Sequence, residues 1–161
     1  DKDPIRFMML NRSNDVELDF DFDKVKEKTK DNPVFYVQYA FARINSLLRI
    51  LNISLNSEIK LNEENFELNA NEEKIIRKIF EWPKIIESVS KKYEIHKIPF
   101  YLYELSTLFH SYWSKGNEDK KYKFIENDKI KRIEILVIIN LISIVIQNGM
   151  KILGVSLPKK M

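Results

Sequence analysis

The stretch NPVFYVQYAFARINSLLR, residues 32–49, predicts a helix with two distinct faces. Its large apolar side chains recur every three or four residues, which is the spacing of a stripe that faces a protein core. This stripe consists of Val34, Val37, Phe41, Ile44, Leu48 and, just beyond the stretch, Leu51. A second stripe, about 120° away at roughly 100° per residue, carries Tyr36, Tyr39 and Arg43. The helix therefore presents an aromatic and cationic face beside its core face.

Two interpretations of that second face are open. Tyrosine rings and a guanidinium suit unpaired bases and phosphates, since stacking of a base on an aromatic ring contributes roughly 1–3 kcal/mol. Alternatively, Tyr36 and Tyr39 pack against a neighbouring helix while Arg43 is solvated, and periodicity alone favours this interpretation. Arg49 does not share the face of Arg43, so only a helix end or a bend would bring the two close.

Composition limits the classes of function that this chain can have. Its 161 residues, 44% hydrophobic and 32% charged, are typical of one globular soluble domain. There is no cysteine, which excludes disulfides and cysteine zinc sites, and the two histidines form no paired metal-binding motif. The three glycines form no phosphate-binding loop. The net charge is only +3, so a surface for a polyanion requires local segregation of charge.

The periodicity along the chain predicts an all-α protein, a helical bundle from about residue 33 onward with a short mixed segment before it. Expected helices cover residues 4–12, 33–51, 71–89 with a break or kink at Pro83, 98–114 and 128–153. We expect Asn71 to cap the third helix and Gly154 to end the last one. The other predictions are an extended arm over 16–23, polar helical turns over 24–31, and loops over 54–70 and 114–122.

The most apolar stretch is ILVIINLISIVI, residues 135–146. It is shorter than the ~20 residues that a bilayer span needs, and Asn140 and Ser143 interrupt it. We therefore expect a buried central helix and no membrane partner.

A second aromatic region is YLYELSTLFHSYWSK, residues 101–115, which has too many rings for one core stripe. Tyr112 and Trp113 are adjacent, so at most one of them is fully buried. Trp113 either stacks on a base or covers the end of the bundle, and the residues alone favour the second interpretation. His110 and Ser111 are also adjacent, and helical neighbours do not face each other, so no catalytic pair is predicted.

Four separated motifs resemble arginyl-tRNA synthetase, the class I enzyme that joins arginine to its tRNA. They are RFMMLNRSNDVELDFDFD (6–23), NPVFYVQYAFARI (32–44), LYELSTLFHSYW (102–113) and NGMKILGVSLPKKM (148–161). The first looks like the segment that leaves the family's catalytic body, the second is similar to its NPVYYVQYAHARI-type helix, and the last to its C-terminal ending. The matches follow the family's order and extend over nearly the whole chain.

The resemblance implies a helical anticodon-binding domain over residues 33–161, preceded in residues 1–32 by the tail of the catalytic and stem-contacting region. The family's RNA-contacting positions correspond here to Tyr36, Tyr39, Arg43, Arg49, Trp113 and Met161. Trp113 stands where tyrosine is common, which keeps a stacking plane and replaces a hydroxyl with an indole N–H. Lys159 and Lys160 replace the Glu-Arg pair of the family's ending, so the tail is more positive here than in the family. From the residues alone, the two lysines are either solvated or bind a phosphate backbone.

The HIGH-like and KMSK-like catalytic signatures of class I synthetases are absent from these residues. The resemblance therefore implies RNA binding without catalysis, no catalytic residue, and no metal or cofactor in this chain. The full-length enzyme would use ATP with magnesium, and its partners would be arginine tRNA and its own catalytic domain. We also expect a cytoplasmic monomer. Two rival functions remain, a standalone helical RNA-binding module and a protein-interaction module that uses the same aromatic residues as interface anchors.

Overall fold

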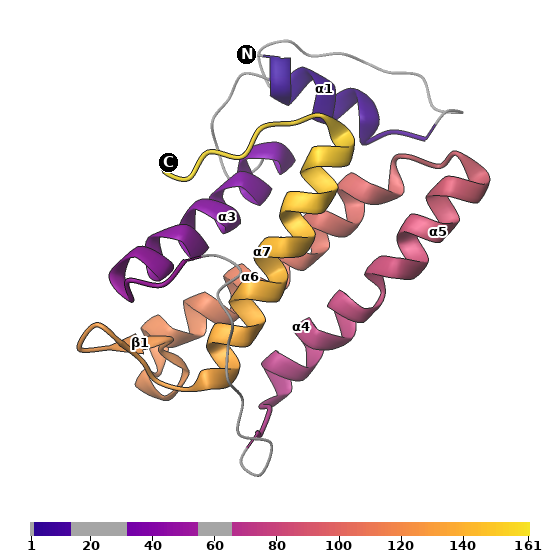
Figure 1. Cartoon of the computed structure of the whole chain (residues 1–161). Helices are drawn as coiled ribbons and strands as arrows, with labels where there is room; N and C mark the ends of the chain where they lie inside the picture. The colour runs from indigo at the N-terminus through magenta and orange to yellow at the C-terminus, as the bar shows by residue number, and fades with distance from the viewer. Residues whose placement is uncertain (1, 14–31, 55–65) are drawn as a thin grey trace.

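The computed structural model describes residues 2–13, 32–54 and 66–161, which form a helical bundle (Figure 1). The predicted all-α class is confirmed. The helices are α1 (Lys2–Leu10), α3 (Pro33–Ile50), α4 (Ala70–Phe80), α5 (Trp82–Lys92), α6 (Lys97–Glu118) and α7 (Ile133–Leu153). A 3-10 turn, η2 (Lys120–Tyr122), and a hairpin of β1 (Ile125–Glu126) and β2 (Lys129–Ile130) connect α6 to α7. The predicted arm over 16–23 and the polar turns over 24–31 lie outside the described residues.

Helix α7 is the central element of the bundle and packs against α1, α3, α4 and α6. By length and composition alone α7 could cross a membrane, and 61% of its most apolar window is buried inside the protein. Ile139, Ile142 and Ile146 have no exposed surface. The expected buried central helix is confirmed.

Helix α3 forms as its sequence predicts. Asn32 caps it by accepting a hydrogen bond from the Val34 backbone N–H at 3.4 Å, and Pro33 occupies the first helical position. The predicted stripe from Val34 to Leu48 is buried against α6, α7 and α1, while Leu51 is only half-buried. The same helix therefore supplies one wall of the core and leaves its second face available.

The start of α4 differs from the prediction. Asn69, and not Asn71, is the cap: its side-chain oxygen accepts from the backbone N–H of Glu72 at 3.2 Å. The Glu72 carboxylate in turn accepts from the Asn69 backbone N–H at 2.8 Å, which completes a reciprocal capping box. The Asn-x-x-Glu spacing satisfies two terminal donors at once, so the helix begins at Ala70. The expected break at Pro83 is confirmed, because α4 ends at Phe80 and Pro83 lies in the first turn of α5.

The connection between α6 and α7 also departs from the prediction. Helix α6 continues past residue 114 to Glu118. Gly116 allows the backbone of Lys123 to pack closely against this last part of the helix, because a Cβ there would lie 3.2 Å from the Lys123 Cα. The predicted start of the last helix at residue 128 is wrong, because 125–130 form the hairpin and α7 begins at Ile133. Asn127 and Asp128 form its turn with φ of 50° and 58°, the left-handed pair of a type I′ turn.

Candidate nucleic-acid interface

Arg43 lies at the centre of the aromatic and cationic face, where four contacts hold its guanidinium. Nη2 donates to the Tyr39 hydroxyl at 2.7 Å, and Nη1 donates to Nδ1 of His110 at 3.3 Å. The guanidinium carbon lies 4.4 Å from the ring centroid of Tyr39 and 4.9 Å from that of Trp113. The cation–π contact with Trp113 joins α3 to α6, whereas the contact with Tyr39 lies within α3. Within the described residues Arg43 has no ion pair, so its positive charge is not neutralised there.

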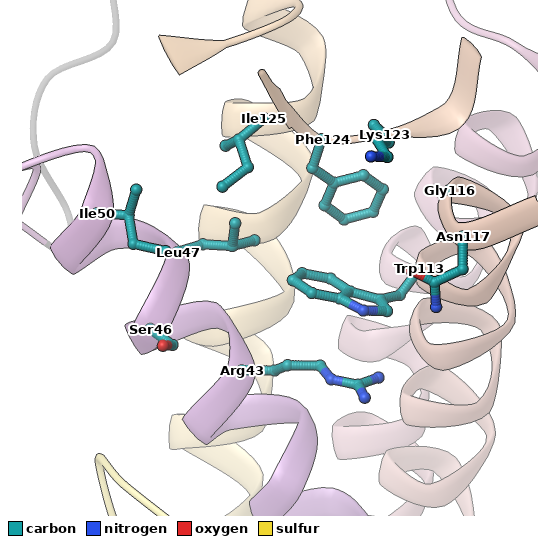
Figure 2. A pocket seen from close by; sticks show the side chains of 10 residues that line it. All are labelled: Arg43, Ser46, Leu47, Ile50, Trp113, Gly116, Asn117, Lys123, Phe124 and Ile125. Carbon is teal, nitrogen blue, oxygen red and sulfur yellow. The ribbon is translucent and has the colours of Figure 1, made fainter. Parts of the chain in front are cut away.

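A hollow of about 330 Å³ opens on one side of Arg43 (Figure 2). Its lining residues are Arg43, Ser46, Leu47, Ile50, Trp113, Gly116, Asn117, Lys123, Phe124 and Ile125. Figure 2 shows the indole of Trp113 between the Arg43 side chain and the ring of Phe124. The walls are therefore flat and apolar, with two cationic groups at the margin, which is a suitable environment for a planar base and its phosphate.

A second hollow of about 320 Å³ opens beside Arg43. It is lined by Tyr39, Ala42, Arg43, Ser46, Arg49, Lys160 and Met161. The structure thus brings together four of the predicted contact residues, including Arg43 and Arg49, which the sequence placed on different faces. Arg49 reaches this hollow from the last turn of α3, and the chain terminus closes it from the other side.

A third hollow, of about 510 Å³, lies next to Arg49 and has a basic lining. Arg49, Lys159 and Lys160 contribute its charges, and Asn45 and Ser54 contribute polar groups. The two lysines are exposed, so they can meet an anionic backbone directly. The net charge of the chain is only +3, so a surface for a polyanion requires basic residues to gather in one place, and they do so at this edge of the site.

The position of the C-terminal tail is held by contacts to α1 and α3. Gly154 ends α7 with a φ of 65°, a left-handed conformation that favours glycine, and its carbonyl accepts from Arg6 Nη1 at 3.0 Å. The Asp3 carboxylate accepts from the Ser156 backbone N–H at 3.1 Å and from its hydroxyl. Gln38 Nε2 donates to the Ser156 carbonyl at 2.9 Å. These hydrogen bonds fix the chain at Gly154 and Ser156, so the residues that follow lead toward the second hollow, which Lys160 and Met161 line.

Tyr36 and Trp113 occupy different environments. Tyr36 is half-buried, with its ring centroid 4.5 Å from that of His110 and 5.2 Å from that of Tyr103, and it lines neither hollow beside Arg43. Trp113 packs on Phe109 and Phe124 at centroid distances of 6.0 and 5.4 Å and still faces the first hollow. Trp113 therefore covers the end of the bundle and also offers a surface to a ligand.

His110 is a part of the site that the sequence did not identify. It is 7% exposed, and it lies between α6 and α3 with its Nε2 3.2 Å from the Tyr36 carbonyl oxygen. Burial lowers the pKa of His110 to about 4, and the Arg43 charge acts in the same direction. The ring is therefore neutral at physiological pH. Its signals in the sequence are its place in the LYELSTLFHSYW motif and its position three residues before Trp113 on the same helix.

A buried polar network supports the Trp113 end of α6. Glu72 has no exposed surface, and its carboxylate accepts from the Tyr112 hydroxyl at 2.7 Å and from Arg132 Nη1 at 3.1 Å. Burial, followed by this hydrogen bond, raises the pKa of the Tyr112 hydroxyl. Arg132 also donates to the Glu67 carbonyl and pairs with Glu134 at 3.5 Å. The network joins the starts of α4 and α7 to α6, one residue before Trp113.

This helical fold is that of a known class of anticodon-binding domains. The DALR anticodon binding domain family matches residues 37–161, and the chain belongs to this family. The protein is similar to arginine–tRNA ligases over 99% of its length: it is 52% identical to that of Pelagibacter ubique over 160 residues and 40% identical to that of Agrobacterium fabrum over 167. The chain spans 28% of the length of each of these relatives. The predicted resemblance to arginyl-tRNA synthetases is confirmed.

Solved structures of arginyl-tRNA synthetases share the fold. The enzyme from Plasmodium falciparum superposes with a TM-score of 0.76 at 19% identity, and that from Thermus thermophilus with 0.76 at 20%. Each match covers 99% of this chain and 26% of the longer one. The predicted bundle type is therefore confirmed, while the contact residues and the boundary between residues 32 and 33 stay predictions.

Proposed function

We propose that this chain binds the anticodon loop of arginine tRNA as one part of an arginine–tRNA ligase. The observation that carries the proposal is the guanidinium of Arg43, held by Tyr39 and Trp113 at the border of two hollows. Aromatic surfaces next to oriented hydrogen-bond donors are the usual means of binding unpaired loop bases. Membership of the DALR anticodon binding domain family supports the same function.

The central anticodon base is the natural target, because the anticodons for all arginine codons have cytosine in the middle. Cytosine presents two acceptors on its Watson–Crick edge, O2 and N3, whereas uracil carries a hydrogen on N3. Arginine has only donors, so a guanidinium facing N3 accepts cytosine and rejects uracil. We place this base in the second hollow, between Tyr39, Arg43 and Met161, where the flexible thioether packs beside it. A neighbouring base stacks on Trp113 in the first hollow.

Affinity, in contrast to specificity, comes from charges around the hollows. Arg49, Lys159 and Lys160 lie where a backbone following the second hollow would pass. Their interaction with phosphates releases counterions and makes binding depend on salt.

Catalysis belongs to the part of the ligase outside these 161 residues. ATP with magnesium, and arginine, would bind there, and anticodon binding would help to place the acceptor end of the tRNA for aminoacylation. This chain alone would bind RNA without catalysing the reaction, as a cytoplasmic monomer in contact with its own catalytic domain.

A titration of the chain with an arginine-tRNA anticodon stem-loop tests the proposal. The matched ligand carries uracil in place of the central cytosine, at the same salt concentration. Preference for cytosine supports anticodon reading by this domain. Equal binding of both would leave a standalone helical RNA-binding module, and no binding of either would favour a protein-interaction module.

A further inference from the structure

We propose that His110 is a positioning residue for the RNA site, and that one neutral tautomer of its ring orients the guanidinium of Arg43. This inference rests on the proposed function, because it assigns the residue that prepares Arg43 to read a base. His110 is placed by α6, whereas the residue it orients belongs to α3.

The two partners of His110 require one tautomer. A main-chain carbonyl only accepts hydrogen bonds, so the contact of 3.2 Å between Nε2 and the Tyr36 carbonyl oxygen requires a hydrogen on Nε2. A guanidinium only donates, so the contact of 3.3 Å between Arg43 Nη1 and Nδ1 requires a lone pair on Nδ1. Both bonds form only in the neutral ring that is protonated at Nε2.

The surroundings of the ring hold it in this orientation. The side chain is 7% exposed, and the rings of Tyr36, Tyr39 and Phe109 lie at centroid distances of 4.5, 5.4 and 5.5 Å. The ring of Tyr39 is nearly parallel to the imidazole, with an interplanar angle of 23°. Rotation of His110 would therefore disturb three aromatic contacts, and the lowered pKa agrees with a ring that stays neutral.

The consequence for Arg43 is a guanidinium fixed at two points. Nη1 donates to His110 and Nη2 to the Tyr39 hydroxyl, which leaves the remaining N–H groups of the fork to meet a ligand. The flexible side chain then loses less conformational entropy when RNA binds, because it is already ordered. Without the acceptor on Nδ1, one of these two points is lost.

A pair of substitutions separates this role from simple packing. His110→Asn places an amide oxygen near the position of Nδ1 and keeps an acceptor for Arg43, but its amide does not extend to the Tyr36 carbonyl. His110→Gln extends toward that carbonyl and loses the acceptor near Cγ. Both remove the ring and its stacking. Measured against the anticodon stem-loop, His110→Asn is expected to bind within about threefold of the parent, and His110→Gln about tenfold more weakly with a smaller preference for central cytosine.

Thermal unfolding of both variants serves as the control for stability. Equal losses of affinity in the two variants, or losses that follow their melting temperatures, would overturn the positioning role. If the parent chain shows no preference for cytosine, the proposed function fails first. If the parent has the preference and the two variants behave alike, only the role of His110 fails.

Nitrogen NMR of the parent chain tests the tautomer without altering the site. The other histidine, His96, is assigned with a His96→Asn variant. Long-range nitrogen–proton correlations at neutral pH are expected to show a hydrogen on Nε2 of His110 and none on Nδ1. A hydrogen on Nδ1, or a doubly protonated ring, would overturn the inference even if the variants fail to fold.

Discussion

The guanidinium carbon of Arg43 in α3 lies 4.9 Å from the ring centroid of Trp113 in α6. The two residues belong to different sequence motifs, and only the packing of α3 on α6 brings them together. A cation over an indole is attracted by about 0.5–2 kcal/mol, depending on how far water is excluded. The contact therefore orders the Arg43 side chain, which lines both the first and the second hollow.

Trp113→Phe is expected to keep most of the affinity for the anticodon stem-loop, because a flat ring remains against Arg43 and Phe124. Trp113→Ala removes the stacking plane and should weaken binding by roughly 1–3 kcal/mol. It should also lower the melting temperature, since the indole packs on Phe109 and Phe124.

Tyr39→Ala is the companion variant: Tyr39 is 41% exposed, so the affinity for the anticodon stem-loop should fall while the fold stays stable. Unchanged affinity in both alanine variants would remove these rings from the site.

Replacement of Lys159 and Lys160 by alanine should reduce the salt dependence of RNA binding. Each lysine that neutralises a phosphate of a single strand contributes about 0.7 to the slope of log affinity against log salt. If both act, the slope falls by about 1.4 between roughly 50 and 200 mM salt. The cytosine preference should remain, because the two lysines contact phosphates and not the base. A slope equal to that of the parent would show that the tail lysines are only solvated.

Glu72→Gln should strongly destabilise the fold. Glu72 is buried and accepts from Tyr112 and Arg132, so neutralising it removes one of the two carboxylates that pair with Arg132 and weakens both hydrogen bonds, at a cost of about 1–3 kcal/mol. Glu73→Gln is the matched control, since Glu73 is 53% exposed and lies 3.9 Å from an exposed Arg77; its effect should be below about 0.5 kcal/mol. Urea unfolding measures both. Similar free energies of unfolding in the two variants would contradict the role of the buried network.

Acidification should destabilise the chain through His110. Its pKa falls from 6.5 to about 4 on folding, so between these values the unfolded chain binds a proton that the folded chain does not. The contribution of the neutral His110 ring to the free energy of unfolding is therefore fully present above pH 6.5. It is lost as the pH falls toward 4, and the loss amounts to at most about 3 kcal/mol. His110→Asn cannot titrate, so the free energy of unfolding should depend less on pH in that variant. Identical pH dependence in parent and variant would contradict the buried neutral ring.

Much of this fold follows from local patterns in the sequence. The stripe from Val34 to Leu48, the break at Pro83 and the glycine end of α7 are predictable because each depends on neighbouring residues alone. The hairpin at 125–130 was missed although Asn127-Asp128 is a turn signal, because the apolar residues around it also fit a helical period.

The arrangement of the site is less predictable, because it depends on contacts between distant parts of the chain. Arg43 and Arg49 share a hollow only because the tail returns to α3, and that path is held by Asp3 and Arg6 at the other end of the sequence. His110 is also invisible to periodicity, since its partners are a main-chain carbonyl and a side chain of another helix.

The most direct test combines one substitution in the protein with one in the RNA. The parent chain and Arg43→Lys are each titrated with the anticodon stem-loop and with its central uracil counterpart at one salt concentration. Lysine keeps the charge and loses the planar fork, so the affinity for phosphate should remain while discrimination falls. We expect the parent to prefer cytosine by about tenfold or more and Arg43→Lys to lose most of that preference. Equal binding of both RNAs by the parent, or an unchanged preference in Arg43→Lys, would contradict reading of the central cytosine by Arg43.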